Sequence, residues 1–168
     1  MQIGRPAPDF SLPDLSGKSR RLSDCRGRIA IVNFWSAECP WAERADRELL
    51  SYLRGREEQV RLLPIAANAH ETDAMCAAAA RTRGLPLVLR GGPEVQDAYE
   101  ARTTPHIFIV DEQGVLRYRG ALDDVSFRRR QATRFYVREA LEALLAGRLP
   151  DPAETPPYGC AIVRFVLE

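Results

Sequence analysis

Hydrophobic residues along the chain follow two patterns, continuous runs and helical periodicity, and these predict buried strands and amphipathic helices. The runs at residues 29–35 and 60–67 are apolar with little alternation, which is typical of strands that a sheet buries on both faces. Between them, apolar residues recur at helical spacing and line one side of a predicted helix: Trp41, Ala45, Leu49, Tyr52 and Leu53. Asp46 falls largely on the opposite, polar side. The order therefore predicts a strand, a helix and a second strand.

Smaller elements are predicted on both sides of this unit. Residues 10–12 and 19–22 flank a turn and are expected to pair as a hairpin. Asn68, followed three residues later by Glu71, predicts the start of an Ala-rich helix that continues to about residue 83. The remaining pattern predicts an extended piece, a short helix, a hairpin and a longer periodic helix, at residues 85–90, 93–101, 107–119 and 132–146.

A crossover of this length makes the two buried strands parallel, so that their carboxyl ends meet at the same edge of the sheet. Active sites in open α/β sheets lie at that edge, and we expect residues 68–70 to lie near Cys39 there. Pro64 donates no hydrogen bond, which argues for a sheet edge or an interrupted ladder at its strand. The chain fits one α/β domain (1–168), with a Pro-rich C-terminal arm (148–168) packing on it.

Composition and charge exclude several classes of partner. Hydrophobic residues make up 45% and charged residues 28% of the chain, as in ordinary globular proteins. The 24 basic and 23 acidic residues give a formal net charge of +1, from which no attraction to nucleic acid or to an anionic membrane follows. No apolar stretch reaches the roughly 20 residues of a membrane span, and the N-terminus shows no signal-peptide segment. We therefore expect a cytoplasmic location.

One of the four cysteines lies where a thiol becomes reactive. Four are too few for a disulfide scaffold, so in a reducing compartment they are free thiols unless one pair is redox-active. Cys39 lies between the first buried strand and the following helix, and Pro40 comes next. Because proline is favoured at the first helical position, Cys39 is the predicted N-cap, with its sulfur aimed at the unpaired N–H groups of the first turn. The partial positive charge there favours a thiolate.

Five segments carry a family resemblance: Gly4-Arg5-Pro6-Ala7-Pro8-Asp9-Phe10, Leu22-Ser23-Asp24-Cys25-Arg26-Gly27-Arg28, Phe34-Trp35 to Cys39-Pro40, Thr104-Pro105-His106-Ile107-Phe108 and Asp111-Glu112-Gln113-Gly114. Together they resemble the thioredoxin-like superfamily, specifically its peroxiredoxin-like branch (alkyl hydroperoxide reductase/thiol-specific antioxidant, AhpC/TSA, or redoxin). Residues 117–120, 123–124 and 138–147 look like one small bacterial subgroup with a single Cys-Pro active-site cysteine. That subgroup commonly ends in Gly-Cys-x-Ile, which Gly159-Cys160-Ala161-Ile162 matches.

The resemblance implies a thioredoxin-like fold, in which helices flank a central mixed β-sheet; the N-terminal β-hairpin and the Pro-rich C-terminal arm are added to it. It also implies a cis-proline that faces the active cysteine, and Pro105 takes that place. In such proteins the backbone beside the cis-proline docks the partner's extended chain next to the thiol. Thr104, Pro105 and His106 are therefore predicted to form a substrate groove.

The chain departs from both redox chemistries of the superfamily. Dithiol members carry Cys-x-x-Cys, whose second thiol resolves the mixed disulfide, and here Ala42 stands at the second position. Peroxidase members carry Pro-x-x-x-Thr/Ser-x-x-Cys; this chain keeps Ser36 three residues before Cys39 but has Val32 in place of the proline. Peroxidases also use an arginine where this chain has the turn 104–106. The dithiol chemistry thus lacks one part and the peroxidase chemistry two.

Two interpretations of Cys160 stay open. It follows a proline-stiffened arm that is long enough to swing back across the domain, so it is a candidate to lie near Cys39 as its resolving or disulfide partner. Alternatively, it is a tail cysteine packed against the sheet. Cys25 and Cys76 are expected to be small buried core residues.

Other residues are predicted to support the site. They are Trp35, Ser36, Glu38, Pro40, Trp41 and His70. The two tryptophans are interpreted as packing around the cysteine. His70 and His106 fall near the active edge, where each either stabilises a thiolate or shuttles a proton, or is a hydrogen-bonded loop or strand-start residue. The histidines and cysteines lack metal-ligand spacing and no Gly-rich phosphate loop occurs, so neither a metal nor a cofactor is expected.

These observations favour a thiol-disulfide oxidoreductase with Cys39 and Cys160 as catalytic residues. The Cys39 thiolate attacks a disulfide or an oxidised sulfur, and Cys160 or an external thiol resolves the adduct. One alternative is a one-cysteine peroxidase, in which Cys39 forms a sulfenic acid. Another is a non-catalytic module that holds an extended peptide in the cis-proline groove. The expected partners are a disulfide-bearing protein or a small thiol or peroxide substrate, and an external thiol reductant.

Overall fold

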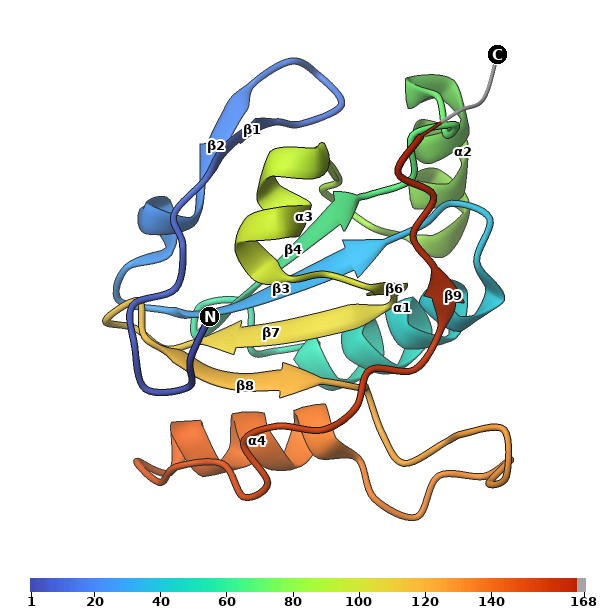
Figure 1. Cartoon of the computed structure of the whole chain (residues 1–168). Helices are drawn as coiled ribbons and strands as arrows, with labels where there is room; N and C mark the ends of the chain where they lie inside the picture. The colour runs from blue at the N-terminus through green and yellow to red at the C-terminus, as the bar shows by residue number, and fades with distance from the viewer. Residues whose placement is uncertain (166–168) are drawn as a thin grey trace.

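The computed structural model describes residues 1–165, so the last residues of the predicted arm and apolar tail (166–168) lie outside the described residues. Its centre is a five-stranded sheet in the order β5-β4-β3-β7-β8 (Figure 1). The strands are β3 Ile29–Trp35, β4 Val60–Ala66, β5 Leu89–Arg90, β7 His106–Val110 and β8 Leu116–Gly120. β3, β4 and β5 are parallel, whereas β7 and β8 are antiparallel to their neighbours. The predicted mixed sheet of an α/β fold is confirmed.

Strand β3 lies in the middle of the sheet, which explains its continuous apolar sequence. All seven of its residues are buried. It pairs with β4 from Ile29 opposite Val60 to Trp35 opposite Ala66, so the two strands end level. Pro64 lies inside β4, and β5 pairs only with the two residues that follow it. The hydrogen-bond ladder on that side is thus interrupted at the proline, as predicted.

Helices cover both faces of the sheet. Helix α1 (Pro40–Leu53) and helix α4 (Tyr136–Leu145) pack their apolar residues on the face that contains Ile29, Ile31 and Ile109. Helix α3 (Pro93–Tyr99) packs on the other face with residues of the N-terminal segment. Helix α2 (Asp73–Arg83) lies beside α1. The described part of the chain contains no helix that is both long and apolar enough to cross a membrane.

The predicted N-terminal hairpin is present. Strands β1 (Ser11–Pro13) and β2 (Ser19–Arg21) pair antiparallel, and a short 3-10 helix, η1 (Leu22–Cys25), follows them. The predicted second hairpin is formed by β7 and β8.

Two predicted helix starts are wrong, and in both cases a polar side chain has another partner. Helix α2 begins at Asp73 rather than near Asn68, because the Thr72 hydroxyl caps it by accepting a hydrogen bond from the amide of Met75 at 3.2 Å. Helix α4 begins four residues after the predicted start. Before it, the amides of Thr133 and Arg134 donate to the Asp124 carboxylate at 2.7 and 3.1 Å, which holds this segment in a non-helical turn.

The C-terminal arm follows the outer edge of the sheet before it reaches the site (Figure 1). The amide of Arg119 in β8 donates to the carbonyl of Ala153, and the amide of Thr155 donates to the carbonyl of Arg119. The Thr155 hydroxyl also accepts from the Ala121 amide at 3.0 Å and bonds with the Tyr118 hydroxyl at 2.7 Å. Farther along, the arm contains β9 (Cys160–Ala161), which pairs antiparallel with β6 (Thr103–Thr104).

The hydrogen bonds of Thr155 generate a stability prediction. In Thr155→Val the side chain keeps its shape, but the buried Ala121 amide loses its acceptor and the Tyr118 hydroxyl loses one of two partners. We expect the free energy of unfolding to fall by about 1–3 kcal/mol, measured by urea denaturation of the disulfide-bonded protein. Thr155→Ser, the control, keeps the hydroxyl and should lose about 0.8 kcal/mol or less. Equal losses in both variants would contradict the role of the hydroxyl.

Candidate functional site

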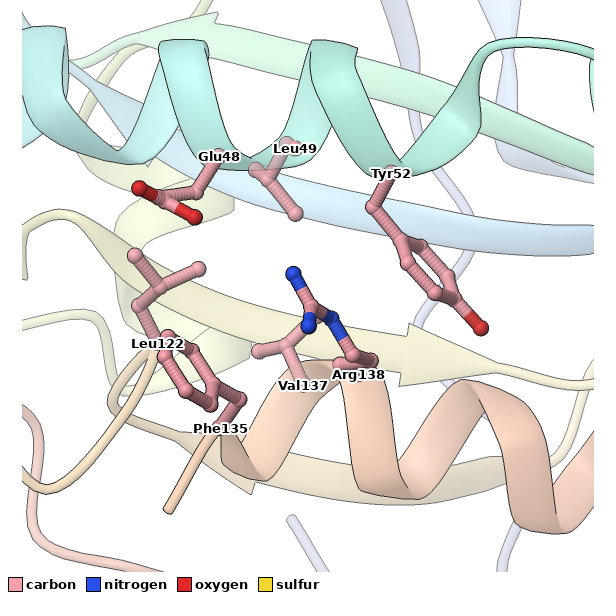
Figure 2. A pocket seen from close by; sticks show the side chains of 7 residues that line it. All are labelled: Glu48, Leu49, Tyr52, Leu122, Phe135, Val137 and Arg138. Carbon is pink, nitrogen blue, oxygen red and sulfur yellow. The ribbon is translucent and has the colours of Figure 1, made fainter. Parts of the chain in front are cut away.

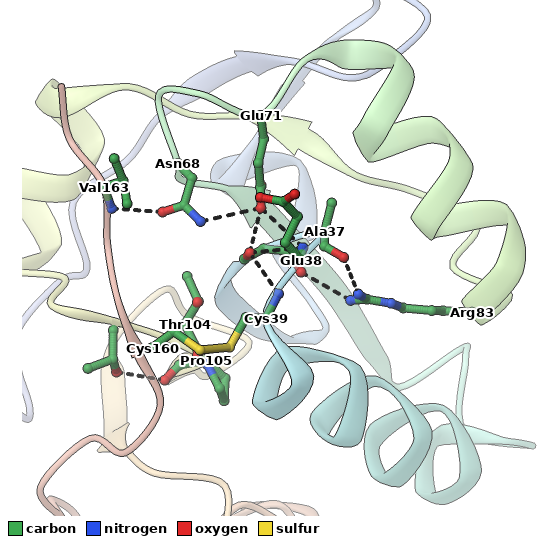
Figure 3. Close-up of a disulfide and its surroundings, with 12 residues drawn as sticks. Ala37, Glu38, Cys39, Asn68, Glu71, Arg83, Thr104, Pro105, Cys160 and Val163 are labelled. Atoms are coloured by element: carbon green, nitrogen blue, oxygen red, sulfur yellow. Dashed lines mark hydrogen bonds between the residues drawn. A yellow bond between two sulfur atoms is a disulfide. The ribbon is translucent and has the colours of Figure 1, made fainter. Parts of the chain in front are cut away.

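A disulfide joins the two cysteines that the sequence singled out. Cys39 and Cys160 are 121 positions apart in sequence, and their Cα atoms lie 6.3 Å apart (Figure 3). Cys39 is almost fully buried, with 4% of its surface exposed. Of the two interpretations left open for Cys160, the structure shows the one that places it beside Cys39, while the catalytic role of either cysteine stays a prediction. Cys25 and Cys76 are free and buried as expected, and burial raises the pKa of both thiols.

The backbone of Cys39 lies at the start of α1, as predicted, but its sulfur does not point to the first turn of the helix. Cys39 is the N-cap residue with extended backbone, Pro40 is the first helical residue, and the amide of Glu43 donates to the Cys39 carbonyl at 3.1 Å. The sulfur makes no capping hydrogen bond to the first turn. It is bonded to Cys160 and lies 3.0 Å from the carbonyl oxygen of Thr104 instead. The expectation that the sulfur caps the helix is wrong, because the disulfide draws it toward β6.

The tail of the chain occupies the groove beside the predicted cis-proline. The peptide bond between Thr104 and Pro105 is cis. Thr104 pairs with Cys160 and Thr103 with Ala161, so β9 runs antiparallel to the segment just before the proline. The resemblance assigned this groove to the extended chain of a partner. In the structure it holds residues of the same chain.

Further contacts hold the tail on both sides of Cys160. The rings of Tyr158 and Trp41 meet edge to face, with their centroids 5.0 Å apart. The amide of Val163 donates to the side-chain oxygen of Asn68, and the amide of Ala69 donates to the Val163 carbonyl, both at 2.8 Å. The segment after β4 thus lies near Cys39, as its position at the carboxyl end of that strand predicted.

A buried carboxylate organises the turn that precedes Cys39 (Figure 3). The Ser36 hydroxyl donates to Glu71 at 2.5 Å, and it accepts from the amides of Glu38 and Cys39 at 3.2 and 3.1 Å. The same Glu71 oxygen accepts from the Asn68 side chain at 3.3 Å. Hydrogen bonds therefore link the docked tail to the Cys39 amide through Asn68, Glu71 and Ser36. Sequence reasoning missed Glu71, although its place soon after β4 was the available signal.

A second buried carboxylate, Asp46, is connected to the same turn through Arg83. It was expected on the polar side of α1, and this is wrong: it is fully buried and accepts hydrogen bonds from the Trp35 indole at 2.8 Å and from Arg83 at 3.2 Å. Burial raises the pKa of Asp46 to about 6. Arg83 also donates to the carbonyls of Ser36 and Ala37. Arg83 thus links Asp46 to the backbone of the turn before Cys39, and Trp35 gives Asp46 its second hydrogen-bond partner.

The two histidines have different environments. His70 is exposed, and its Nε2 lies 2.7 Å from the Glu38 carboxylate. His106 begins β7 and is buried; its Nδ1 accepts from the Arg102 amide at 3.3 Å, and its ring packs 4.4 Å from that of Phe108. Burial lowers the pKa of His106 to about 4, assisted by the charges of Arg119 and Arg102. His106 matches the interpretation of a hydrogen-bonded strand-start residue.

Glu38, His70 and Glu71 are the side chains of this site that could hold a cation. Each offers one ligand atom, and these atoms lie within 4.8 Å of one another. The spacing of histidines and cysteines in the sequence did not predict this group, because two of its members are glutamates from different loops. The exposed pair Glu38 and His70 already satisfies itself by a direct hydrogen bond.

A separate pocket lies between α1 and α4 and contains none of the predicted site residues (Figure 2). Its lining is Glu48, Leu49, Tyr52, Leu122, Phe135, Val137 and Arg138. The Arg138 guanidinium lies 5.4 Å from the centroid of the Tyr52 ring and 4.8 Å from that of Phe135. The pocket lining contains no cysteine, serine, threonine or histidine, and burial raises the pKa of the Tyr52 phenol, which disfavours its ionised form.

The buried His106 generates a pH prediction. Its pKa is near 4 in the folded protein and about 6.5 in the unfolded chain, so the unfolded chain binds more protons between these values and stability falls as the pH falls through that window. His106→Asn keeps an acceptor for the Arg102 amide but does not titrate. Between about pH 7.5 and pH 5, the wild type should lose about 2 kcal/mol more of its free energy of unfolding than the variant.

The comparison with the variant is needed because Asp46 acts in the opposite direction. Its raised pKa makes the folded protein the better proton binder between about pH 4 and 6, so stability rises there as the pH falls. This contribution is common to both proteins and cancels in the difference. The free energy of unfolding of both proteins is measured by urea denaturation at each pH. Equal losses in the two proteins between about pH 7.5 and pH 5 would show that His106 is not held neutral by the fold.

Comparisons with known sequences place the chain in a family. Residues 3–119 match the AhpC/TSA family. Thiol-disulfide oxidoreductase ResA of Geobacillus kaustophilus (strain HTA426) is 32% identical over 117 residues, which cover 68% of this chain and 67% of the relative. ResA of Bacillus thuringiensis (strain Al Hakam) is 30% identical over 116 residues, covering 68% of this chain and 66% of the relative. The chain thus spans about two thirds of the length of these curated relatives.

Solved structures share the fold of this chain. An uncharacterized conserved protein from Geobacillus kaustophilus aligns with a TM-score of 0.88 and 27% identity, covering 99% of this chain and 94% of that one. The thioredoxin domain of a thiol-disulfide oxidoreductase from Bacteroides vulgatus aligns with a TM-score of 0.64 and 22% identity, covering 71% and 88%, and this shows the shared fold. With the mixed sheet and the family match over more than half of its length, the chain belongs to the AhpC/TSA family of the thioredoxin-like superfamily.

Proposed function

We propose that this protein is a thiol-disulfide oxidoreductase whose redox pair is Cys39 and Cys160. The observation that carries the proposal is the disulfide between the N-cap residue of α1 and a cysteine of the strand docked beside the cis-proline. The relatives named thiol-disulfide oxidoreductase support the same reaction class. Ala42 occupies the place of a second active-site cysteine, and Cys160 supplies the second thiol from the other end of the chain.

The proposed reaction is two successive thiol-disulfide exchanges. The Cys39 thiolate attacks one sulfur of a substrate disulfide, a Cys39–substrate disulfide forms, and the other substrate sulfur leaves as a thiolate that takes up a proton. The Cys160 thiolate then attacks the Cys39 sulfur, which forms the observed disulfide and releases the second substrate thiol. The substrate gains two electrons and the protein loses two. An external thiol reductant returns the protein to its dithiol state.

The surroundings of Cys39 fit the first step. The N-terminus of α1 carries partial positive charge, which stabilises a thiolate at Cys39. Ser36 and Arg83 hold the preceding turn by hydrogen bonds to its amides and carbonyls, so the nucleophile lies on a fixed backbone. The two other thiols, Cys25 and Cys76, are buried with raised pKa values and are inert in this scheme.

We favour disulfide exchange over the peroxidase alternative because the chain lacks two parts of the peroxidase site. Val32 stands where peroxidases have a proline, and the turn 104–106 stands where they have an arginine. We also favour disulfide exchange over a non-catalytic peptide-binding module, because the Cys39–Cys160 disulfide holds the chain's own tail in the groove where such a module would bind its peptide. We further propose that the chain belongs to the subgroup that ends in Gly-Cys-x-Ile and that it is located in the cytoplasm. Its proposed substrates are disulfide-bearing proteins or small disulfides, and neither nucleic acid nor a membrane is a proposed partner.

The cysteine roles can be tested by single substitutions in the reduced full-length chain. With insulin and a thiol reductant, we expect Cys39→Ser to abolish catalysed disulfide reduction, because the nucleophile is gone. Cys160→Ser, reduced beforehand and mixed with insulin after the reductant has been removed, should still make the first attack but stop at a mixed disulfide, since the resolving thiol is missing, and intact-mass analysis should detect this adduct. Cys76→Ala, a control in the Ala-rich helix α2, should react like the wild type.

Two results would contradict this scheme. Cys160→Ser turning over at the wild-type rate without a trapped adduct would remove Cys160 from the mechanism. A stopped-flow reaction of Cys39 with hydrogen peroxide far faster than that of a free thiol, combined with no insulin reduction, would replace the oxidoreductase by the peroxidase. A protein inert in both assays would leave the binding module.

A further inference from the structure

Residues 158–163 show what an extended chain must satisfy in order to place a cysteine sulfur on Cys39. The groove is made of parts that belong to the fold rather than to the tail: the backbone of Thr103 and Thr104, the cis Pro105, and the Trp41 ring. With the tail docked, Thr104 is fully buried and Cys39 nearly so. An external chain in the same register therefore meets the same constraints as the tail.

The residue before the incoming cysteine is the most restricted position. A Cβ added to Gly159 would overlap the Thr104 carbonyl oxygen, and it would lie 2.7 Å from the carbonyl carbon and 3.0 Å from Cδ of Pro105. The first two atoms are backbone, and all three belong to the buried core of the site, so they cannot move aside as the end of a flexible side chain would. The φ angle of Gly159 is not positive, so the lack of space, rather than the backbone conformation, requires glycine here.

Positions farther from the cysteine add weaker preferences. Two residues before it, the Tyr158 ring packs against Trp41. Three residues after it, Val163 bonds to Asn68 and Ala69 only through its backbone, which any residue except proline can provide. The pattern that the groove accepts is therefore an aromatic residue, a glycine and the cysteine, followed by an extended segment.

We propose that the groove selects protein disulfides in which the attacked cysteine follows a glycine, preferably with an aromatic residue before it, and that the tail of this chain competes for the same place. The inference rests on the proposed oxidoreductase function and names its substrate class. Because Cys160 and a substrate cysteine both need the backbone of Thr104, only one of them can pair with it at a time. In the second exchange, the substrate segment therefore leaves the Thr104 backbone while its sulfur is still bonded to Cys39, and Cys160 then docks and attacks. The tail must leave before a substrate of this class enters.

The test uses the reduced full-length Cys160→Ser protein and two synthetic peptides. One peptide has the sequence of residues 158–163, Tyr-Gly-Cys-Ala-Ile-Val, and the other has alanine in place of its glycine. Each carries 5-thio-2-nitrobenzoate on its cysteine as a mixed disulfide. Cys39 attacks the peptide sulfur, the bond to thionitrobenzoate breaks, and the coloured thiolate is released, so a single turnover is read by absorbance.

We expect the glycine peptide to react at least about tenfold faster than the alanine peptide, a difference equivalent to about 1.4 kcal/mol. Dithiothreitol must react with both peptides at the same rate, which shows that their intrinsic reactivities match. A peptide with alanine in place of the tyrosine should react more slowly than the parent peptide, by less than the glycine replacement causes. Equal rates for the glycine and alanine peptides would overturn the proposed selection.

Competition by the tail is tested with a second protein, Cys160→Ser combined with Gly159→Ala. The added Cβ should displace the tail from the groove, so this protein should react faster with the glycine peptide than Cys160→Ser alone. An unchanged rate would overturn the competition. The proposed function itself fails if neither peptide reacts faster with the protein than with free cysteine, whereas fast but equal reactions of both peptides overturn only the selection.

Discussion

The backbone pairing of β9 with β6 is the interaction on which the site depends. Two residue pairs, Thr103 with Ala161 and Thr104 with Cys160, place a thiol from the end of the chain against the N-terminus of α1. Closing a loop of 121 positions is entropically costly, and the arm lowers that cost in stages. The arm is first held along β8 at Thr155, so only a few residues span the distance from there to Cys160.

The sequence predicted the fold and the position of Cys39 because both follow from local patterns. A run of seven residues without alternation, all apolar except Asn33, is typical of a strand in the middle of a sheet, and β3 is that strand. Two parallel strands that end level bring residues 68–70 to Cys39. The Cys-Pro pair fixed the helix start. Each of these inferences needs only the order of residues along one segment.

The errors share one cause, which is a polar residue whose partner comes from elsewhere in the chain. Asp46 has the helical position of a surface residue, and only Trp35 and Arg83 of α2 make its burial possible. Asn68 and Glu71 have the spacing of a helix start, but their side chains bond to the docked tail and to the turn before Cys39. The spacing of residues along a helix indicates which face a side chain lies on, but it does not indicate which side chains of other elements pack against that face.

The separation of the two thiols on different elements orders the chemistry. In a Cys-x-x-Cys site both sulfurs lie on one helical turn, and the groove beside the cis-proline stays open to a partner in both redox states. Here the oxidised state itself fills the groove, because Cys160 reaches Cys39 only as part of β9. Two hydrogen bonds join Val163 of the tail to residues 68–69, and Asn68 is linked to the turn before Cys39 through Glu71 and Ser36. In the disulfide-bonded structure the tail therefore fills the groove while the turn that carries Cys39 keeps its hydrogen bonds to Glu71 and Arg83, and the tail must leave before another chain can pair with Thr104.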